Sequence, residues 1–413
     1  MIARTLSPTA MATPAPTLSL KEVLRLKPVR RLWAAQVVSI FGDFLAIFAI
    51  YSVASFRMHA TATEISLILV SFLLPLAIVG PLAGVFVDRW NVKRTMIASD
   101  LTRAVLAALL AGATDIREIY VILFALSSVS SFFIPAQTVA LRTIVPPAGL
   151  MSANALMQSA IQLVQVISPA VAGVLVASVS PNACFWLDSV SFLFSAAMIY
   201  LLTIDREPSR KPLNVASVIT EMNAGMKFIF THSAVSFVII SLTAGMFAIR
   251  CFFALIAVYV RDVLHGGSAL FGSISSLVGV GIIAGTQFIR HFARTRSKGH
   301  LVILGLVGIG VSIVLMAAFA NIPVTMVATL GIGFWVGFLI VPTQVLLQEE
   351  TPKDMLGRVT SSLMSVMSLS QVLAMSGAGP IAESIGIQNL YYLSAALLLG
   401  IAAFGYPRIP KHA

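Results

Sequence analysis

Two residues of opposite charge lie inside stretches that are otherwise apolar. Asp43 lies in IFGDFLAIFAI, and Arg250 lies in AIRCFFAL, 207 positions further along the chain. A charge in the middle of a membrane span costs on the order of 3 kcal/mol, so such a residue usually faces an aqueous cavity or an opposite charge. We expect Asp43 and Arg250 to border one cavity, where they gate a route, bind a zwitterionic headgroup, or form a pair that protonation of Asp43 breaks. The structural alternative is an ion pair that only fixes the fold.

Amide side chains indicate a second polar surface. Gln158, Gln162 and Gln165 are spaced i, i+4, i+7, which places them on one face of a helix. That face is predicted either to line a polar cavity or to join neighbouring helices by hydrogen bonds. Other amides and flexible thioethers are assigned to the same cavity, because they suit a varied amphipathic ligand; core filling is the alternative for the thioethers. These residues are Gln36, Gln137, Gln371, Met364 and Met367.

The connection GVFVDRWNVKR, residues 84–94, concentrates charge between two apolar stretches. It carries one acid and three bases, and two further charged residues follow it within the next apolar stretch. A cytoplasmic loop is expected to be basic for topological reasons alone. The candidate functional residues of this connection and of the stretch that follows it are Gly84, Asp88, Arg89, Lys93, Arg94, Asp100 and Arg103.

Two more carboxylates join Asp43 as possible proton carriers. Asp188 and Glu383 lie near the outer ends of the sixth and eleventh apolar stretches. Solvation at the membrane interface offers an alternative in which neither carries a proton. No His pair has metal-ligand spacing, and we expect no metal site, no cofactor and no catalytic residue.

These residues belong to a chain with the composition of a membrane protein. Of 413 residues, 58% are hydrophobic and 10% are charged, and the mean hydropathy is +0.96. Soluble domains carry about 25% charged residues. Apolar runs of about 20 residues, enough to cross a bilayer, recur along the whole chain. Cys184 and Cys251 both lie in such runs and are expected to be buried thiols without a disulfide.

The apolar runs predict an all-α membrane protein with twelve transmembrane helices in two pseudo-symmetric six-helix bundles. The expected helices lie near 32–55, 64–87, 95–113, 118–142, 152–179, 183–204, 235–261, 268–291, 300–320, 323–347, 357–385 and 388–407. The expected division is a cytoplasmic disordered and basic segment 1–31, a first bundle 32–204, a linker 205–234 with an amphipathic helix, a second bundle 235–407, and a cytoplasmic tail 408–413. No cleavable signal peptide is expected, because no apolar segment of the required kind follows the early bases.

The two bundles resemble one another in sequence. PAQTVALRTIVPPAGL begins at Pro135 and PTQVLLQEETPKDML begins at Pro342, which is again an offset of 207. The segments SPAVAG from Ser168 and GPIAES from Gly379 fall at equivalent points of the fifth and eleventh spans. Two such repeats are what a transporter with alternating access requires, since its site lies between repeats that rock about it.

The basic residues predict the orientation. With a cytoplasmic N-terminus, 22 of the 27 Lys and Arg residues lie in cytoplasmic segments, and Arg57, Arg117 and Arg261 lie on the opposite side. By the positive-inside rule both termini are expected to be cytoplasmic. The predicted location is the bacterial inner membrane, in which the chain spans the bilayer many times.

Several motifs together resemble the major facilitator superfamily over nearly the whole chain. The connection at residues 84–94 is similar to the superfamily's loop between its second and third helices, with Asn91 where many members have Gly. Within the superfamily the chain resembles the macrolide-efflux and enterobactin-exporter branch of drug–proton antiporters, and less closely the bacterial lysophospholipid transporters. The segments that carry the first likeness are DRWNVKRTMIASDLTRAVL, PAQTVALRTIVPPAGLMSANALMQSA, FWLDSVSFLFSA and YVRDVLHGGSALFGSISSLVGVG; those that carry the second are IFGDFLAIFAI, AIRCFFAL and VPTQVLLQE.

The resemblance implies roles for the charged connection. Asp88 would contact the start of the eleventh span near Gly357 and Arg358 while the cytoplasmic side is closed, so that the connection acts as a conformational hinge. A carboxylate at a helix N-terminus gains about 0.3–1 kcal/mol. Two features depart from the antiporter pattern: the fourth span has no early Arg, and the fifth span has only the reduced signature that begins at Ser168. Proton coupling is therefore a separate hypothesis from transport.

The sequence thus predicts a secondary-active exporter of small amphipathic compounds, of the drug or siderophore class, exchanged for protons. A lysophospholipid transporter or flippase is the alternative, and a non-transporting membrane receptor is a third hypothesis. An enzyme and an ATP-driven pump are not expected, since no phosphate-binding Gly-x-x-x-x-Gly-Lys segment occurs. The expected partners are an amphipathic substrate or lipid, protons and the bilayer, with no nucleic acid, and the protein is expected to act as a monomer.

Overall fold

The computed structural model describes residues 18–87, 89–204, 227, 229, 231–292, 297–352 and 355–406. Within these ranges the chain forms thirteen α-helices, a π-helical turn and a short 3-10 turn. Several expectations lie outside the described residues: the disordered segment at 1–17, Asp88, the amphipathic helix in the linker, and the tail beyond residue 406.

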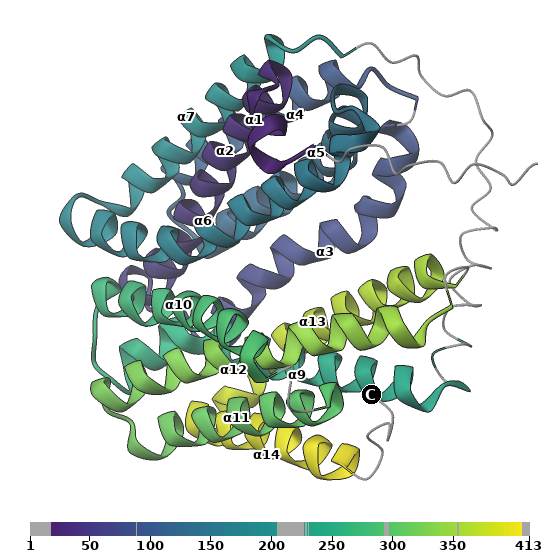
Figure 1. The fold of residues 1–413 in the computed structure, drawn as a ribbon. Coiled ribbons are helices and arrows are strands. Elements are labelled where there is room, and N and C mark those ends of the chain that lie inside the picture. The colour runs from purple at the N-terminus through teal and green to yellow at the C-terminus, as the bar shows by residue number, and fades with distance from the viewer. Residues whose placement is uncertain are drawn as a thin grey trace, which may run out of the picture.

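The helices form two bundles (Figure 1). The N-terminal half consists of α2 (Lys27–Ser52) with the π-helical turn η1 (Val53–Arg57), α3 (Ala62–Val87), α4 (Val92–Leu110), α5 (Ile116–Ile144), α6 (Leu150–Ser178) and α7 (Pro181–Tyr200). The C-terminal half consists of α9 (Ser233–Asp262), α10 (Ser268–Phe292), α11 (Lys298–Phe319), α12 (Ile322–Glu350), α13 (Leu356–Ile385) and α14 (Ile387–Gly405). Each predicted span overlaps one of these helices, which confirms the predicted fold class.

Local capping explains where several helices begin. The Asn91 side chain accepts a hydrogen bond of 3.0 Å from the backbone N–H of Arg94 at the start of α4. Asp115 and Glu118 form a capping box at the start of α5. Asn321 accepts a bond of 2.9 Å from the backbone N–H of Val324 at the start of α12. These polar residues satisfy backbone groups that a helix cannot satisfy internally, so they mark connections between apolar runs.

Ten helical segments of the described chain are long and apolar enough to cross a membrane by composition alone. Neither α4 nor α13 is among them, although both pack within the bundles. Four charged residues account for α4: Lys93, Arg94, Asp100 and Arg103. A span with charges at its middle requires partners inside the protein, and the surroundings of α4 supply them.

A short helix extends the N-terminal half. α1 (Leu20–Arg25) is capped by Ser19 and Glu22, and the Glu22 carboxylate accepts a bond of 2.8 Å from the Ser19 backbone N–H. This bond and the Ser19 hydroxyl lower the pKa of Glu22 below its usual value. The backbone N–H of Leu18 donates to the carbonyl of Ala148, 3.1 Å away, so α1 lies against the start of α6.

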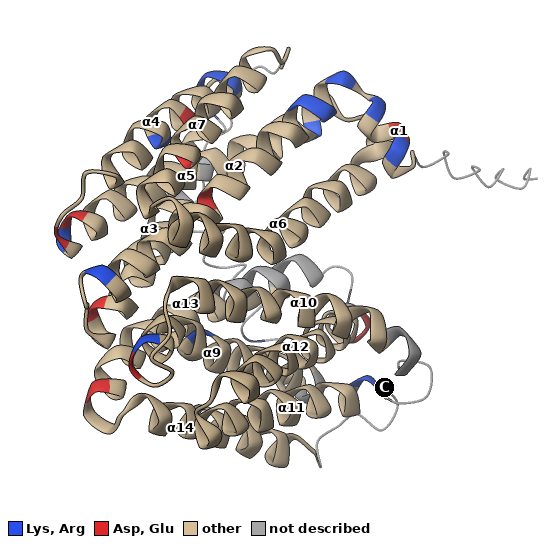
Figure 2. Cartoon of the chain, turned by 90° about the vertical axis from the view of Figure 1, so that its left-hand side faces the viewer, with Lys and Arg blue, Asp and Glu red and all other residues tan. Residues whose placement is uncertain are grey.

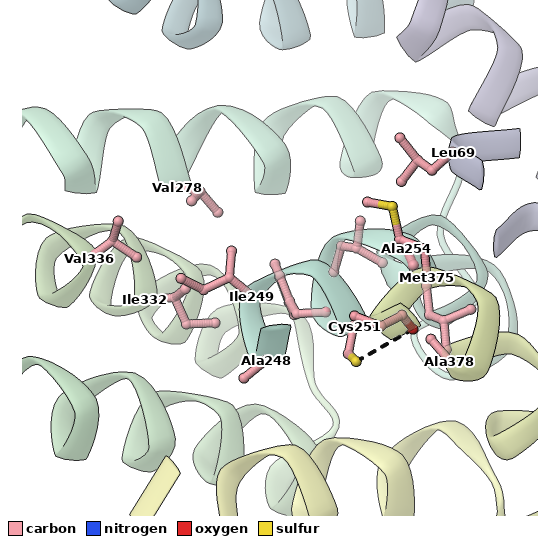
Figure 3. Packing of buried hydrophobic residues seen from close by; sticks show 14 of the residues in the cluster. Leu69, Ala248, Ile249, Cys251, Ala254, Val278, Ile332, Val336, Met375 and Ala378 are labelled. Atoms are coloured by element: carbon pink, nitrogen blue, oxygen red, sulfur yellow. Dashed lines mark hydrogen bonds between the residues drawn. The ribbon is translucent and has the colours of Figure 1, made fainter. Parts of the chain in front are cut away.

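The C-terminal half is built around α9. Figure 3 shows Ala248, Ile249, Cys251 and Ala254 of α9 surrounded by apolar residues of α10, α12 and α13. The Cys251 thiol donates to the Ala374 carbonyl at 3.8 Å. Cys184 and Cys251 are both buried and free, as the sequence predicted.

The two halves contact each other at one end of the bundle. α6 packs on α10, and α3 packs on α13. A Cβ on Gly272 of α10 would lie 2.9 Å from the Gly173 Cα of α6, and a Cβ on Gly379 of α13 would lie 2.7 Å from the Ala62 carbonyl oxygen at the start of α3. We call this the closed end; it contains the connections 53–61 and 263–267. The opposite end, which carries most of the bases, is the basic end.

Candidate functional site: a buried charge cluster and a closed end

Asp43 lies in a cluster of charges inside the N-terminal half. Figure 2 shows acidic residues between α2, α4 and α7, whereas most other charges lie at helix ends. α2 approaches α7 closely because Gly42 has no side chain: a Cβ there would lie 2.5 Å from an Asp188 carboxylate oxygen. Asp43 interacts electrostatically with Arg103 and Asp100, and Asp188 interacts with Asp43 and Arg103.

The centre of the cluster is an ion pair on α4. Arg103 donates from Nη2 to Asp100 Oδ1, and the two side chains are 5% and 0% exposed. The guanidinium carbon of Arg103 lies 4.2 Å from the centre of the Phe133 ring and 4.4 Å from that of Phe192. An arginine between two aromatic faces gains cation–π attraction, so the protein holds this charge in a fixed place.

This geometry corrects several expectations. Asp188 is 1% exposed, so it lies in the interior and not at a solvated interface. Asp100 and Arg103 are buried within the bundle and pair with each other. Their part in the predicted hinge stays a prediction. The sequence missed the cluster because its members come from three helices that are far apart in the chain.

Asp43 and Arg250 do not pair in this structure. The electrostatic neighbour of Arg250 is the hydroxyl of Tyr51 on α2. In the described part of the chain, no carboxylate lies within ion-pairing distance of this guanidinium. Equivalent positions in the two halves therefore have different surroundings: an acidic cluster in the first and, among the described residues, a base without an acidic partner in the second.

The predicted polar residues take up three kinds of position. Gln137 donates from Nε2 to Gln36 Oε1, which ties α5 to α2. Gln158, Gln162 and Gln165 are all exposed on one face of α6, while Gln371 and Met367 of α13 are partly buried. The side chain of Met364 lies outside the described ones. The cavity lining by these residues stays a prediction.

The described part of the charged connection lies at the basic end. Arg89 and Arg94 border a groove of about 670 Å³ together with Trp90 and Phe132, whose rings are stacked 5.7 Å apart. Lys93 lies 5.2 Å from the centre of the Tyr200 ring of α7. The hinge contact itself involves Asp88 and stays a prediction.

The closed end is held by hydrogen bonds between the halves. Nη1 of Arg261 donates to the carbonyl oxygens of Ser55 and Ala60, at 2.7 and 2.9 Å, while Asp262 binds the same guanidinium. The hydroxyls of Ser52 and Ser268 are 2.6 Å apart. These contacts link the end of α2, η1 and the connection after it to α9 and α10 of the C-terminal half. The sequence indicated these contacts only weakly, because Arg261 was distinguished only as one of the few bases on the non-cytoplasmic side.

Two further contacts complete the closed end. The rings of Phe48 on α2 and Phe271 on α10 are stacked, with centres 4.5 Å apart. Glu383, one of the predicted proton carriers, is exposed and accepts a hydrogen bond of 2.8 Å from the backbone N–H of Thr63. Glu383 therefore joins α13 to the start of α3.

The family model of the Major Facilitator Superfamily matches residues 32–375 and 264–413. The chain belongs to this superfamily of membrane transporters, and it is a multi-pass membrane protein. Together the two matched segments include both bundles, as the predicted resemblance required.

Similar proteins agree with this assignment. An uncharacterized transporter of the superfamily from Bacillus subtilis is 27% identical over 91% of both chains. Macrolide efflux protein A of Streptococcus pyogenes is 24% identical over 90% of this chain and 93% of its own. The structure of a bacterial homologue of the human lysosomal transporter Spinster superimposes with a TM-score of 0.71 at 12% identity, covering 93% of this chain and 97% of the other. This last likeness concerns the fold.

Proposed function

We propose that this protein is a secondary-active exporter that moves small amphipathic compounds across the bacterial inner membrane in exchange for protons. The observation that carries the proposal is the one-sided closure of the two halves. The hydrogen bonds that join the halves among the described residues cluster at the closed end, with Arg261 at their centre. A substrate site between two halves that meet at one end is open to the other end.

The orientation follows from the distribution of bases. The basic end contains Arg89, Lys93 and Arg94, and it is the cytoplasmic end by the positive-inside rule. In this orientation the structure is open to the cytoplasm, which is the state that loads a substrate for export. The protein acts as a monomer in this proposal, because each half supplies one wall of the route.

Efflux relatives support a substrate of amphipathic character. The exposed face with Gln158, Gln162 and Gln165 provides amide groups that hydrogen-bond without demanding a particular charge. The thioether of Met367 provides a polarizable apolar surface. In alternating access Asp88 would then stabilise the state in which the cytoplasmic side is closed.

Arg250 favours a second candidate function. A guanidinium without an acidic partner in the described chain suits a phosphate or carboxylate of the substrate. A lysophospholipid carries both this phosphate and an apolar chain. Transport of lysophospholipids between leaflets is therefore the alternative to drug export, and it predicts that Arg250→Gln abolishes lysophospholipid movement.

Transport by purified protein in vesicles tests both functions. The vesicles carry the reconstituted protein with its cytoplasmic end facing the outer solution. A macrolide, a cationic dye, a catecholate chelator and a fluorescent lysophospholipid are each added outside, with and without a pH gradient. Export predicts uptake of at least one soluble amphipath, accelerated by an acidic lumen and lost in Asp43→Asn. The matched control is Glu349→Gln, an exposed acid at the basic end. Uptake of lysophospholipid alone, independent of the gradient, would contradict drug–proton exchange.

A further inference from the structure

A pocket opens on the N-terminal half at the closed end. It has a volume of about 250 Å³ and is formed by η1, the end of α4 with the connection that follows it, and the first turns of α5 and α7. All of its lining residues belong to the N-terminal half, so it lies apart from the space between the two halves. The pocket is therefore separate from the route that alternating access requires.

The pocket has an apolar floor and a polar rim. Leu110 of α4, Ile119 of α5 and Phe185 of α7 line it and are each at most 3% exposed. The exposed rim carries the guanidinium of Arg57 and the hydroxyl of Thr114. This distribution suits a ligand with a compact apolar body and one polar head. The volume of about 250 Å³ lies just below the range of about 300–1,000 Å³ for drug-sized ligands, so the ligand is a small one.

Arg57 supplies the charge of the pocket. In the described part of the chain its guanidinium takes part in no ion pair. Arg261, another base at the closed end, instead donates to two carbonyl oxygens and pairs with Asp262. A guanidinium binds a carboxylate through two parallel charge-assisted hydrogen bonds. The polar head that fits this rim is therefore an anion.

The other polar groups near the rim are compatible with an anion. Asn182, which lines the pocket in the first turn of α7, donates from Nδ2 to the Ala111 carbonyl at the end of α4, 3.1 Å away. The N-terminus of α7 contributes a partial positive charge. Asp115 and Glu118 do not line the pocket, and their carboxylates accept hydrogen bonds from backbone N–H groups at the start of α5.

The wall formed by η1 connects the pocket to the contacts between the halves. Val53 and Met58 line the pocket, and the Met58 backbone N–H donates to the Val53 carbonyl at 2.9 Å. Between them, the Ser55 carbonyl accepts from Arg261 of α9, which also binds the Ala60 carbonyl. π-helical turns are rare and occur frequently at functional sites. One short turn thus borders the pocket and also carries an acceptor that holds the closed end.

We propose that this pocket binds a small amphipathic carboxylate and that its occupancy keeps the closed end shut. Arg57 binds the carboxylate, and the apolar floor receives the body of the ligand. A ligand that bridges Arg57 and the floor holds η1 in the conformation that Arg261 recognises. A ligand that binds the closed conformation in preference to the open one shifts the equilibrium toward the closed one. A solute on the closed side thereby regulates opening without entering the route.

Protection of an introduced thiol tests the site. Thr114→Cys is made in a variant without Cys184 and Cys251, placed in phosphatidylcholine nanodiscs and labelled with an uncharged maleimide. Benzoate should slow the labelling in a saturable way. Benzamide should bind about tenfold more weakly, because it lacks the charge that strengthens the hydrogen bonds to the guanidinium. Arg57→Gln should remove the protection, and so should Gly112→Phe, which places a ring in the pocket lining.

Matched controls accompany both variants. Gly112 has room for a side chain, because a Cβ there would meet only the Leu109 carbonyl at 3.7 Å, and Gly400 of α14 has nothing within 4 Å. Gly400→Phe should therefore retain protection, as should Arg117→Gln, which removes an exposed base outside the pocket lining. Absence of protection by benzoate, equal protection by benzamide, or protection that survives in either pocket variant would overturn the site. Protection by added phosphatidylglycerol but not by benzoate would identify a lipid site and would also overturn it.

The same assay tests the coupling to the closed end. Arg261→Gln loosens the contacts between the halves, so the apparent dissociation constant of benzoate should rise severalfold as the closed fraction falls. Glu349→Gln, which changes an exposed acid at the basic end, should leave the constant unchanged. An unchanged constant in Arg261→Gln would overturn the coupling. No transported compound enters these measurements, so a failure of the pocket and a failure of the proposed function are distinguishable.

Discussion

Replacing Arg103 by methionine is expected to destabilise the protein strongly. The change removes the partner of Asp100, which has no exposed surface. Breaking a buried ion pair in this way costs about 3–5 kcal/mol. The guanidinium also loses its contacts with two aromatic rings at 4.2 and 4.4 Å, each of which contributes about 0.5–1 kcal/mol. Methionine retains the packing of the apolar stem, so the expected total is about 4–7 kcal/mol, which is on the order of a thousandfold or more in the unfolding equilibrium.

A double variant separates the lost charge from the lost volume. In Asp100→Leu with Arg103→Met, the pair is replaced by apolar side chains of similar size, which is often close to neutral for an isolated buried pair. Asp43 and Asp188 still lose their interaction with the guanidinium, so the double variant is expected to recover only the part of the loss that comes from leaving Asp100 unpaired. Arg142→Met, at the exposed end of α5, is the control for removing a basic residue. Unfolding of the detergent-purified protein, followed by tryptophan fluorescence during titration with a denaturing detergent, measures the free energy. If Arg103→Met alone unfolds within about 1 kcal/mol of the wild type, the pair is not the anchor of the cluster.

The other predictions concern the closed end, the amide face and the hinge. Gly272→Leu should prevent the approach to Gly173, and spin-label distances across the closed end should lengthen; unchanged distances would refute the close contact. Arg261→Gln should lose the hydrogen bonds to two carbonyl groups. In variants that lack the native cysteines and carry one introduced cysteine at the closed end, that cysteine should then react faster with a polar thiol reagent. Equal rates would contradict a gate there. Gln162→Cys should react with the same reagent from the basic end, and inertness would favour contact with lipid or another helix. Asp88→Asn should leave expression normal and slow transport severalfold, and a normal rate would remove the hinge role.

Much of the fold could be read from the sequence because a bilayer restricts the solutions. Unpaired backbone groups cannot be tolerated in hydrocarbon, so every long apolar run had to become a helix. Polar residues such as Asn91, Asp115 and Asn321 then fixed the starts of helices by capping. The same constraint explains why α4 could be predicted as a span despite its charges: its neighbours in sequence leave it no other place.

The tertiary structure alone decided which charges meet. Asp43 and Arg250 hold equivalent positions in the two halves. The repeat therefore predicts that they lie at the same depth in the membrane, but it does not predict that their side chains contact each other. The neighbours of Asp43 depend on which helix faces pack together. Because Gly42 has no side chain, α7 packs closely on α2, and Asp188 and the Asp100–Arg103 pair lie near Asp43. The sequence by itself thus determined that the long apolar runs form helices, and approximately where these helices begin and end, because this depends on local hydrophobicity and capping. The charge cluster and the closed end depend on the rotation and approach of helices from distant parts of the chain, and only packing of the whole molecule sets these.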